Sequence, residues 1–184
     1  MKNFPIVILA GFSGTGKSTL GAGFCKTYGY NFIKHQELVH SLAISKGFKR
    51  ARYWLAEVGI GAFISESIEE MILKVKSQDI QKGVLIDVGY GTSMIERFRS
   101  EFPESKIIVV SVLADAKTRE DRILGRMGTE RDAAKQEMNF RDEFLEKAGV
   151  EEVMADADIV IPSEGKPLES VKKLHDEIEE HTLR

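Results

Sequence analysis

Apolar residues gather in five short runs, separated by longer stretches in which polar and apolar positions alternate with a helical period. The first run, 6–10, is continuously apolar between Pro5 and Gly11. Short apolar runs bounded by turn residues are typical of buried strands. The runs that we interpret as strands cover residues 6–10, 31–34, 84–87, 107–112 and 159–161.

The stretches between these runs carry apolar residues at intervals of three and four, which predicts helices. Local signals mark several ends: Gly29 and Pro103 end helices, and Asp115 is placed to cap one. Gly59 and Gly61 interrupt the longest pattern and predict its division into two helices. The predicted helices cover residues 18–28, 35–45, 50–81, 93–102, 115–127, 128–147 and 168–181.

The alternation of strands with helices predicts an open parallel sheet with helices on both faces. We therefore expect a three-layer α/β/α architecture with a five-stranded parallel sheet. A length of 184 residues fits a single domain. Ligands of such folds bind beyond the carboxyl ends of the strands, so side chains that follow the strands are candidates for function.

Composition narrows the class of protein. With 42% hydrophobic and 30% charged residues, the chain is typical of soluble globular proteins. A net charge of −3 gives no electrostatic reason to expect a nucleic-acid partner, and no apolar run approaches the ~20 residues of a membrane helix. Residues 1–5 leave no room for a signal peptide, and Cys25 has no second cysteine to pair with. We expect a cytoplasmic protein without a membrane partner.

One motif follows the first strand directly. Residues 11–18, the glycine loop, read Gly-Phe-Ser-Gly-Thr-Gly-Lys-Ser and match the pattern G-x-x-x-x-G-K-[ST] at every position. A strand before the loop and a helix after it are the context in which this pattern binds phosphate. Glycines let consecutive N–H groups point at one anion, and the helix N-terminus adds to that field. The residues expected to bind ATP are Gly11, Ser13, Gly14, Thr15, Gly16, Lys17, Ser18 and Thr19.

Two side chains of the loop have distinct expected roles. Lys17 is expected to reach the β- and γ-phosphates, and the Ser18 hydroxyl to hold Mg²⁺. Asp87 ends the third predicted strand, as the second acidic group of P-loop enzymes does. Its carboxylate would orient the waters of the Mg²⁺ ion or the attacking hydroxyl. The alternatives are a structural lysine in a glycine-rich turn and an aspartate that caps the next turn.

Charged residues in the helices supply further candidates. Arg119, Arg122 and Arg126 lie on one helical face, suited to clamp a phosphoryl group, or else they form a solvated face. Glu37 is either a base that orients the acceptor hydroxyl or an ordinary first-turn acid. His35 reads as a surface residue, with no convincing metal-ligand spacing among the histidines. Trp54 and Phe63 are expected in the core, because they share helical spacing with aliphatic residues.

Five motifs follow one another along the chain, at residues 11–18, 84–87, 122–126, 140–143 and 155–161. Their order resembles the nucleoside-monophosphate-kinase-like group of P-loop kinases, and in particular the dephospho-CoA kinase-related nucleotide kinases. The resemblance implies a P-loop NTPase fold with a helical lid at 127–147 and an acceptor-binding lobe at 36–80. It also implies that Arg122 stacks on adenine, that Arg126 contacts ATP phosphates, and that the turn containing Gly165 lies beside the adenine.

The acceptor side departs from that pattern. Relatives often carry Asp-x-x-Arg where this chain has Glu37-Leu-Val-His40, and Asp-Gly-x-Arg where it has Asp87-Val-Gly-Tyr90. The missing arginines leave the acceptor open. We predict an ATP- and Mg²⁺-dependent kinase that acts on a nucleotide-like acceptor. The alternatives are a kinase of a non-nucleotide hydroxyl, as in shikimate- or gluconate-kinase-like proteins, and a nucleotide-binding regulatory protein.

Overall fold

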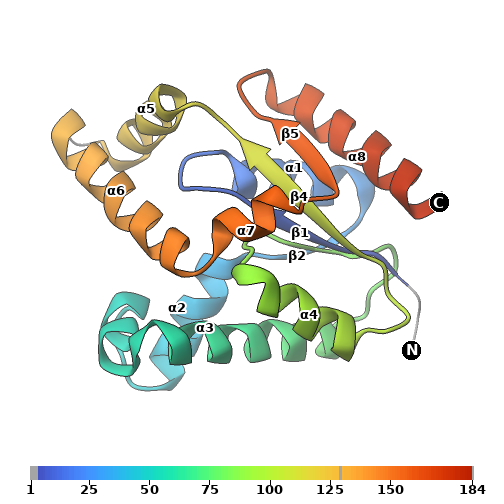
Figure 1. Cartoon of the computed structure of the whole chain (residues 1–184), viewed down its shortest axis with the longest axis horizontal. Helices are drawn as coiled ribbons and strands as arrows, with labels where there is room; N and C mark the ends of the chain where they lie inside the picture. Colours follow the sequence, from blue (N-terminus) through green and yellow to red (C-terminus); the bar gives the residue numbers. More distant parts are fainter. Residues whose placement is uncertain (1–3, 129, 184) are drawn as a thin grey trace.

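The computed structural model describes residues 4–128 and 130–183. Residues 1–3, 129 and 184 lie outside the described part. Residues 1–3 belong to the segment in which no signal peptide is expected, and residue 129 belongs to the expected lid. Five parallel strands form one sheet in the order β2-β3-β1-β4-β5, which confirms the predicted fold class (Figure 1). The strands are β1 (Ile6–Ala10), β2 (Asn31–Ile33), β3 (Val84–Ile86), β4 (Ile107–Leu113) and β5 (Ile159–Pro162).

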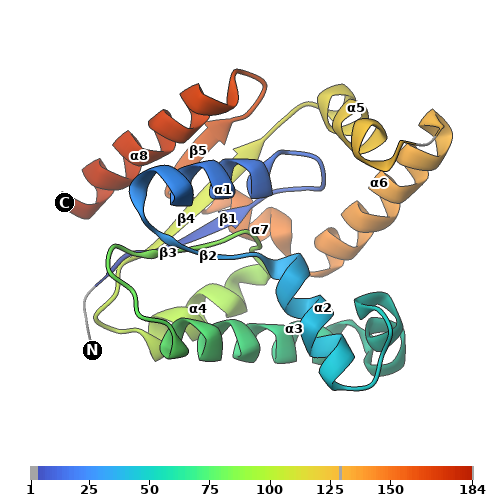
Figure 2. The ribbon, with the colours of Figure 1, turned by 180° about the vertical axis from the view of Figure 1, so that it is seen from behind.

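Side chains along β1 alternate between two cores, one on each face of the sheet. Ile6 and Ile8 pack with α3 (Ala51–Ser77), α4 (Gly91–Glu101) and α7 (Val150–Ala155), whereas Val7 and Leu9 pack with α1 (Lys17–Tyr28) and α8 (Pro167–Leu183). Figures 1 and 2 show these two helical layers on opposite faces of the sheet. The helices are α1 (Lys17–Tyr28), α2 (His35–Ser45), α3 (Ala51–Ser77), α4 (Gly91–Glu101), α5 (Ala116–Met127), α6 (Arg131–Lys147), α7 (Val150–Ala155) and α8 (Pro167–Leu183).

The predicted helices agree with the structure to within two residues at each end, except in three places. Helix α6 begins at Arg131 instead of residue 128, because Gly128 ends α5 in a left-handed conformation. Helix α3 ends at Ser77 instead of residue 81, and it breaks at Gly59 alone (φ 78°, ψ 167°), while Gly61 stays helical. The prediction of a break at both glycines is therefore only half right. The short helix α7 was not predicted, because six residues do not establish a helical period.

Two helical arms extend beyond the carboxyl edge of the sheet, with the glycine loop between them (Figure 1). One arm joins α2 to the first half of α3 around buried Trp54 and Phe63, whose rings lie 4.5 Å apart and which belong to a core as expected. The other pairs α5 with α6 around Ile123, Ala134 and Met138. Their roles as acceptor lobe and lid remain predictions. Within residues 4–128 and 130–183, no helix has the length and apolar character of a membrane span.

Candidate phosphoryl-transfer site

The glycine loop forms a tight cradle between β1 and α1. Gly14 (φ 81°) and Gly16 (φ 96°) adopt left-handed backbone angles. A Cβ at Gly14 would lie 2.7 Å from the carbonyl oxygen of Arg119, so no larger residue fits there. Helix α1 begins at Lys17, and its N-cap Gly16 has no side chain to satisfy the first N–H groups. These donors are oriented to bind an anion.

Lys17 lies against the loop that carries it. Its ammonium donates to the carbonyl oxygens of Gly11 at 2.6 Å and Phe12 at 2.9 Å. Burial lowers the pKa of Lys17 to about 8, and the nearby cations Arg119 and Arg126 act in the same direction, against the raising effect of nearby carboxylates. A phosphate would therefore find a desolvated lysine whose positive charge is poorly compensated.

Ser18, in the first turn of α1, meets Asp87, which directly follows β3 at the carboxyl edge of the sheet. The Ser18 hydroxyl donates to Asp87 Oδ2 at 2.7 Å, and the backbone N–H of His35 donates to Asp87 Oδ1 at 2.7 Å. Hydroxyl and carboxylate oxygens are suitable Mg²⁺ ligands. The described residues contain no group of three or more histidine, cysteine or acidic side chains placed to hold a metal, so an ion here would need phosphate and water oxygens as well. Mg²⁺ usually binds proteins in this way, and the residues present fit it.

His35 is a feature that the sequence interpretation missed. Its ring is half-buried, and Nε2 is hydrogen-bonded to the hydroxyl of Tyr90, whose ring lies edge-on at 5.0 Å. Burial lowers the pKa of His35 to about 3, with a further contribution from Lys17. The expectation of a plain surface histidine is therefore wrong. The pairing was not visible in the sequence, because 55 residues separate the two side chains.

Arg119 of α5 connects α6 to the glycine loop. Its Nε donates to the Ser13 carbonyl at 2.7 Å, its guanidinium forms an ion pair with Asp142 of α6, and it lies over the Phe12 ring at 5.2 Å. Asp142 Oδ1 also accepts the Ser13 N–H at 3.2 Å. Both charged side chains are mostly shielded from solvent, at 12% and 15% exposure. Asp142 lies in a motif of the resemblance, but no role had been predicted for it.

Arg122 fixes the loop to the turn after β5. Its Nη1 donates to the carbonyl of Thr15 at 3.0 Å, to the carbonyl of Gly14 at 3.2 Å and to the Ser163 hydroxyl at 3.0 Å. Its Nη2 donates to the Ser163 carbonyl. Ser163 was not predicted as a single residue, although its turn was. Gly165 lies exposed two residues later, and stacking of Arg122 on adenine remains a prediction.

Arg126 has no polar partner within residues 4–128 and 130–183. Partial burial and the guanidinium of Arg141 both lower its pKa. Arg141 is itself paired with Glu137 at 2.6 Å. An anion placed near the two arginines would relieve their repulsion. Of the three arginines predicted on one helical face, Arg126 is thus the one whose charge is available to a phosphate.

Glu37 points to solvent. Its side chain is 71% exposed and forms an ion pair with Lys34 at 2.7 Å. No contact joins it to Asp87 within the described part of the chain. Its role toward an acceptor remains a prediction.

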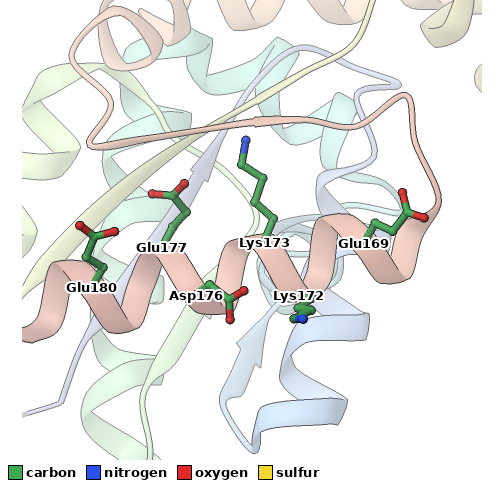
Figure 3. Close-up of a pocket in the computed structure, with 6 residues that line it drawn as sticks. All are labelled: Glu169, Lys172, Lys173, Asp176, Glu177 and Glu180. Carbon is green, nitrogen blue, oxygen red and sulfur yellow. The ribbon is translucent and has the colours of Figure 1, made fainter.

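A shallow hollow of about 420 Å³ lies along α8 (Figure 3). Acidic and basic side chains are mixed there, and none is buried. The hollow is a solvated helix face and contains none of the groups described above. Its lining residues are Glu169, Lys172, Lys173, Asp176, Glu177 and Glu180.

No family model matches the chain. It is 27% identical over 184 residues to a UPF0200 protein of Thermococcus kodakarensis, covering 94% of this chain and 97% of the relative. It is 25% identical over 177 residues to a UPF0200 protein of Thermococcus gammatolerans, covering 92% and 91%. These likenesses extend over nearly the whole chain.

Solved structures match over similar lengths. The shikimate kinase of Aquifex aeolicus superposes with a TM-score of 0.66 at 19% identity, covering 97% of this chain and 98% of the other. The fold is of the shikimate kinase-like P-loop type. A gluconokinase of Sinorhizobium meliloti superposes with a TM-score of 0.56 at 17% identity, covering 94% and 90%. At these identities the likeness establishes the fold and leaves the substrate open.

Proposed function

We propose that this protein is an ATP- and Mg²⁺-dependent kinase of a small molecule. The observation that carries the proposal is the hydrogen bond from the Ser18 hydroxyl to Asp87 Oδ2 at 2.7 Å. It lies directly beside a glycine loop whose N–H groups are oriented to bind phosphate. A phosphate cradle alone would also serve a nucleotide-binding regulator. A carboxylate beside it, at the carboxyl edge of the sheet, supplies what transfer to a second molecule requires.

The side chains divide the work of transfer. Lys17 would leave the Gly11 and Phe12 carbonyls to contact the β- and γ-phosphates. Arg126 would stabilise charge on the moving phosphoryl group. Ser18 and Asp87 would hold Mg²⁺, which when bound neutralises phosphate charge. The match of the fold to shikimate kinase and gluconokinase supports this assignment, because both are kinases of small molecules.

The test measures ADP formation and thermal stability together. With a non-hydrolysable ATP analogue at ~100 times its dissociation constant and Mg²⁺ present, we expect stabilisation of about 2.7 kcal/mol, or several degrees in Tm. Chelation of the metal should remove most of this shift. ADP formation should accelerate with one member of a panel of nucleoside monophosphates, dephospho-CoA, shikimate and gluconate.

The variant Lys17→Ala is the control for the site. It should lose phosphoryl transfer while keeping the thermal transition of the free protein, because within the described residues the ammonium donates only to two carbonyls of its own loop. Wild-type turnover in Lys17→Ala would contradict the assignment. Binding of ATP with no acceptor-dependent turnover would favour a nucleotide-binding regulator.

A further inference from the structure

The glycine loop already binds an anion that belongs to the chain itself. The backbone N–H of Ser13 donates to Asp142 Oδ1 at 3.2 Å, and the guanidinium of Arg119 forms an ion pair with Asp142 Oδ2. Asp142 lies on α6, 129 residues away from Ser13 along the chain. A backbone N–H of a glycine loop and a guanidinium are donors with which proteins bind phosphate oxygens. The carboxylate of Asp142 therefore lies in a site that is suited to a phosphate.

Little solvent reaches this contact. The side chains of Arg119 and Asp142 are 12% and 15% exposed, and the centre of the Phe12 ring lies 5.2 Å from the guanidinium carbon. Charges that are shielded from water interact more strongly than charges at the surface. The Ser13 N–H has a single proton to donate, and a phosphate beside the carboxylate would be repelled by it. A phosphate and Asp142 are therefore mutually exclusive ligands of the loop.

The other side chain that holds the loop uses groups of the opposite polarity. Arg122 donates to the carbonyl oxygens of Gly14 and Thr15, which a phosphate, itself an acceptor, does not need. Among the described residues, Asp142 is the one side chain that accepts a hydrogen bond from a backbone N–H of the glycine loop. Arg122 thus supports the loop and leaves its donors in place, whereas Asp142 occupies one of them.

Helix α6 also has contacts that do not depend on Asp142. Met138 packs against Ile123 of α5, and the Phe144 ring lies edge-on to Phe63 at 5.9 Å between ring centres. Release of the carboxylate would loosen α6 from the glycine loop while these contacts keep the helix in place. A variant without the carboxylate is therefore expected to fold.

We propose that Asp142 is an internal competitor of ATP, and that a phosphate of the nucleotide takes over its two donors, the Ser13 N–H and the Arg119 guanidinium. The inference rests on the proposed function and adds a built-in restraint to the same site. No covalent bond changes in this exchange. Arg119 exchanges one anionic partner for another, and the released carboxylate regains its hydration in water. Binding of the nucleotide therefore releases α6 from the glycine loop.

The test measures the dissociation constant of a non-hydrolysable ATP analogue with Mg²⁺ by isothermal titration calorimetry. Asp142→Ala should bind the analogue about tenfold more tightly than the wild type, the worth of one hydrogen bond to a charged group. Asp142→Asn should gain less, about threefold, because its amide oxygen still accepts the Ser13 N–H but carries no charge. Inorganic tripolyphosphate, which lacks the base, should show the same order of affinities.

Glu146→Gln is the matched control for charge. It removes the same charge as Asp142→Asn from an exposed position on α6, and its dissociation constant should stay within about twofold of the wild-type value. The thermal transition of each variant without ligand verifies that it folds. If Asp142→Ala does not fold, the direction of the change in Asp142→Asn decides the question.

Unchanged or weaker binding by the Asp142 variants would overturn the inference, because the carboxylate would then only shape the loop. An equal gain in Glu146→Gln would also overturn it, since the effect would be one of net charge. So would a gain for the ATP analogue that tripolyphosphate does not share, because the competition would then concern the base. In these three cases the proposed kinase function stands. If neither the wild type nor Asp142→Ala binds either probe, the proposed function itself is overturned.

Discussion

At the residue scale, two arginines of α5, Arg122 and Arg126, differ in what already holds them. Arg122 is bonded to carbonyls of the glycine loop and to Ser163, whereas Arg126 has no polar partner within the described residues. The first is therefore part of the framework that shapes the loop. The second carries charge that a phosphate can use.

We expect the variants Arg122→Ala and Arg126→Ala to separate these roles. Arg122→Ala should lower the stability of the protein by about 1–3 kcal/mol, because buried carbonyls lose a charged donor, and should raise KM for ATP. Arg126→Ala should mainly lower kcat, because the charge it meets shifts during transfer. Thermal unfolding and steady-state kinetics measure both effects. Identical behaviour of the two variants would contradict the division.

Arg122→Lys is the matched control for geometry. Lysine keeps the charge but lacks the planar fork that reaches Thr15 and Ser163 together. We expect it to recover less than half of the lost stability. Full recovery would indicate that charge alone matters at this position.

Sequence reasoning was strongest where a site is local. The glycine loop, Lys17 and Ser18 occupy adjacent positions, so a single pattern defines them. Tyr90 could not be predicted as a partner of His35, because that contact requires knowing that β2 lies beside β3. For the same reason the contact between Asp142 and the glycine loop could not be predicted, because 129 residues separate Asp142 from Ser13.

At the scale of single elements, α3 offers a matched pair of glycines. Gly59 has φ 78° and ψ 167°, a region that is essentially closed to residues with a side chain. Gly61 is helical, and an added Cβ would meet nothing within 4 Å at either position. Gly59→Ala should therefore destabilise the protein by about 1–3 kcal/mol. Gly61→Ala should stabilise it by about 0.5–1 kcal/mol.

Denaturant unfolding of the two variants measures this difference directly. Because neither site has a close neighbour, a difference between them reports the backbone conformation and not packing. If alanine changed the free energy of unfolding equally at the two positions, the break of α3 at Gly59 would be contradicted.

Helix α6 reaches the glycine loop through one carboxylate. Asp142 contacts both Arg119 and the Ser13 N–H. We expect Asp142→Ala to accelerate amide hydrogen exchange over residues 131–147. Glu146→Ala, an exposed carboxylate on the same helix, should leave the exchange unchanged. Equal protection of α6 in both variants would show that another contact holds the helix.

At the scale of the whole molecule, the two hydrophobic cores lie on opposite faces of the sheet, and each is covered by its own helices. The face covered by α1 and α8 encloses Cys25, which is 8% exposed. Burial raises the pKa of this thiol to about 12. The ordinary value of 9.0 then applies only after unfolding. The contribution of the buried Cys25 thiol to the free energy of unfolding is therefore fully present below pH 9, and it is lost as the pH rises toward 12.

We expect an Ellman-type reagent at pH 8 to label Cys25 very slowly in the folded protein. The reaction requires thiolate, and the folded chain has roughly one part in ten thousand in that form, against about a tenth after unfolding. Labelling should follow the denaturant transition. Rapid labelling of the native protein would show that α1 and α8 open readily.

The architecture as a whole was predictable because each strand is a short apolar run and each major helix shows its period. The order of the strands was not. Ladder partners such as Ile6 with Val84 and Ile107 are set by packing between distant segments, and no local pattern encodes them.

That strand order has a consequence for synthesis on the ribosome. β1 lies between β3 and β4, so the earliest-made strand cannot acquire both neighbours until Leu113 has emerged. At 5–20 residues per second, the roughly 95 residues from Ser18 to Leu113 take about 5–20 s to translate. For that interval the nascent chain carries its glycine loop without the sheet that shapes it. If the protein binds ATP as proposed, we expect the nucleotide to stabilise the chain only after more than half of it has been made.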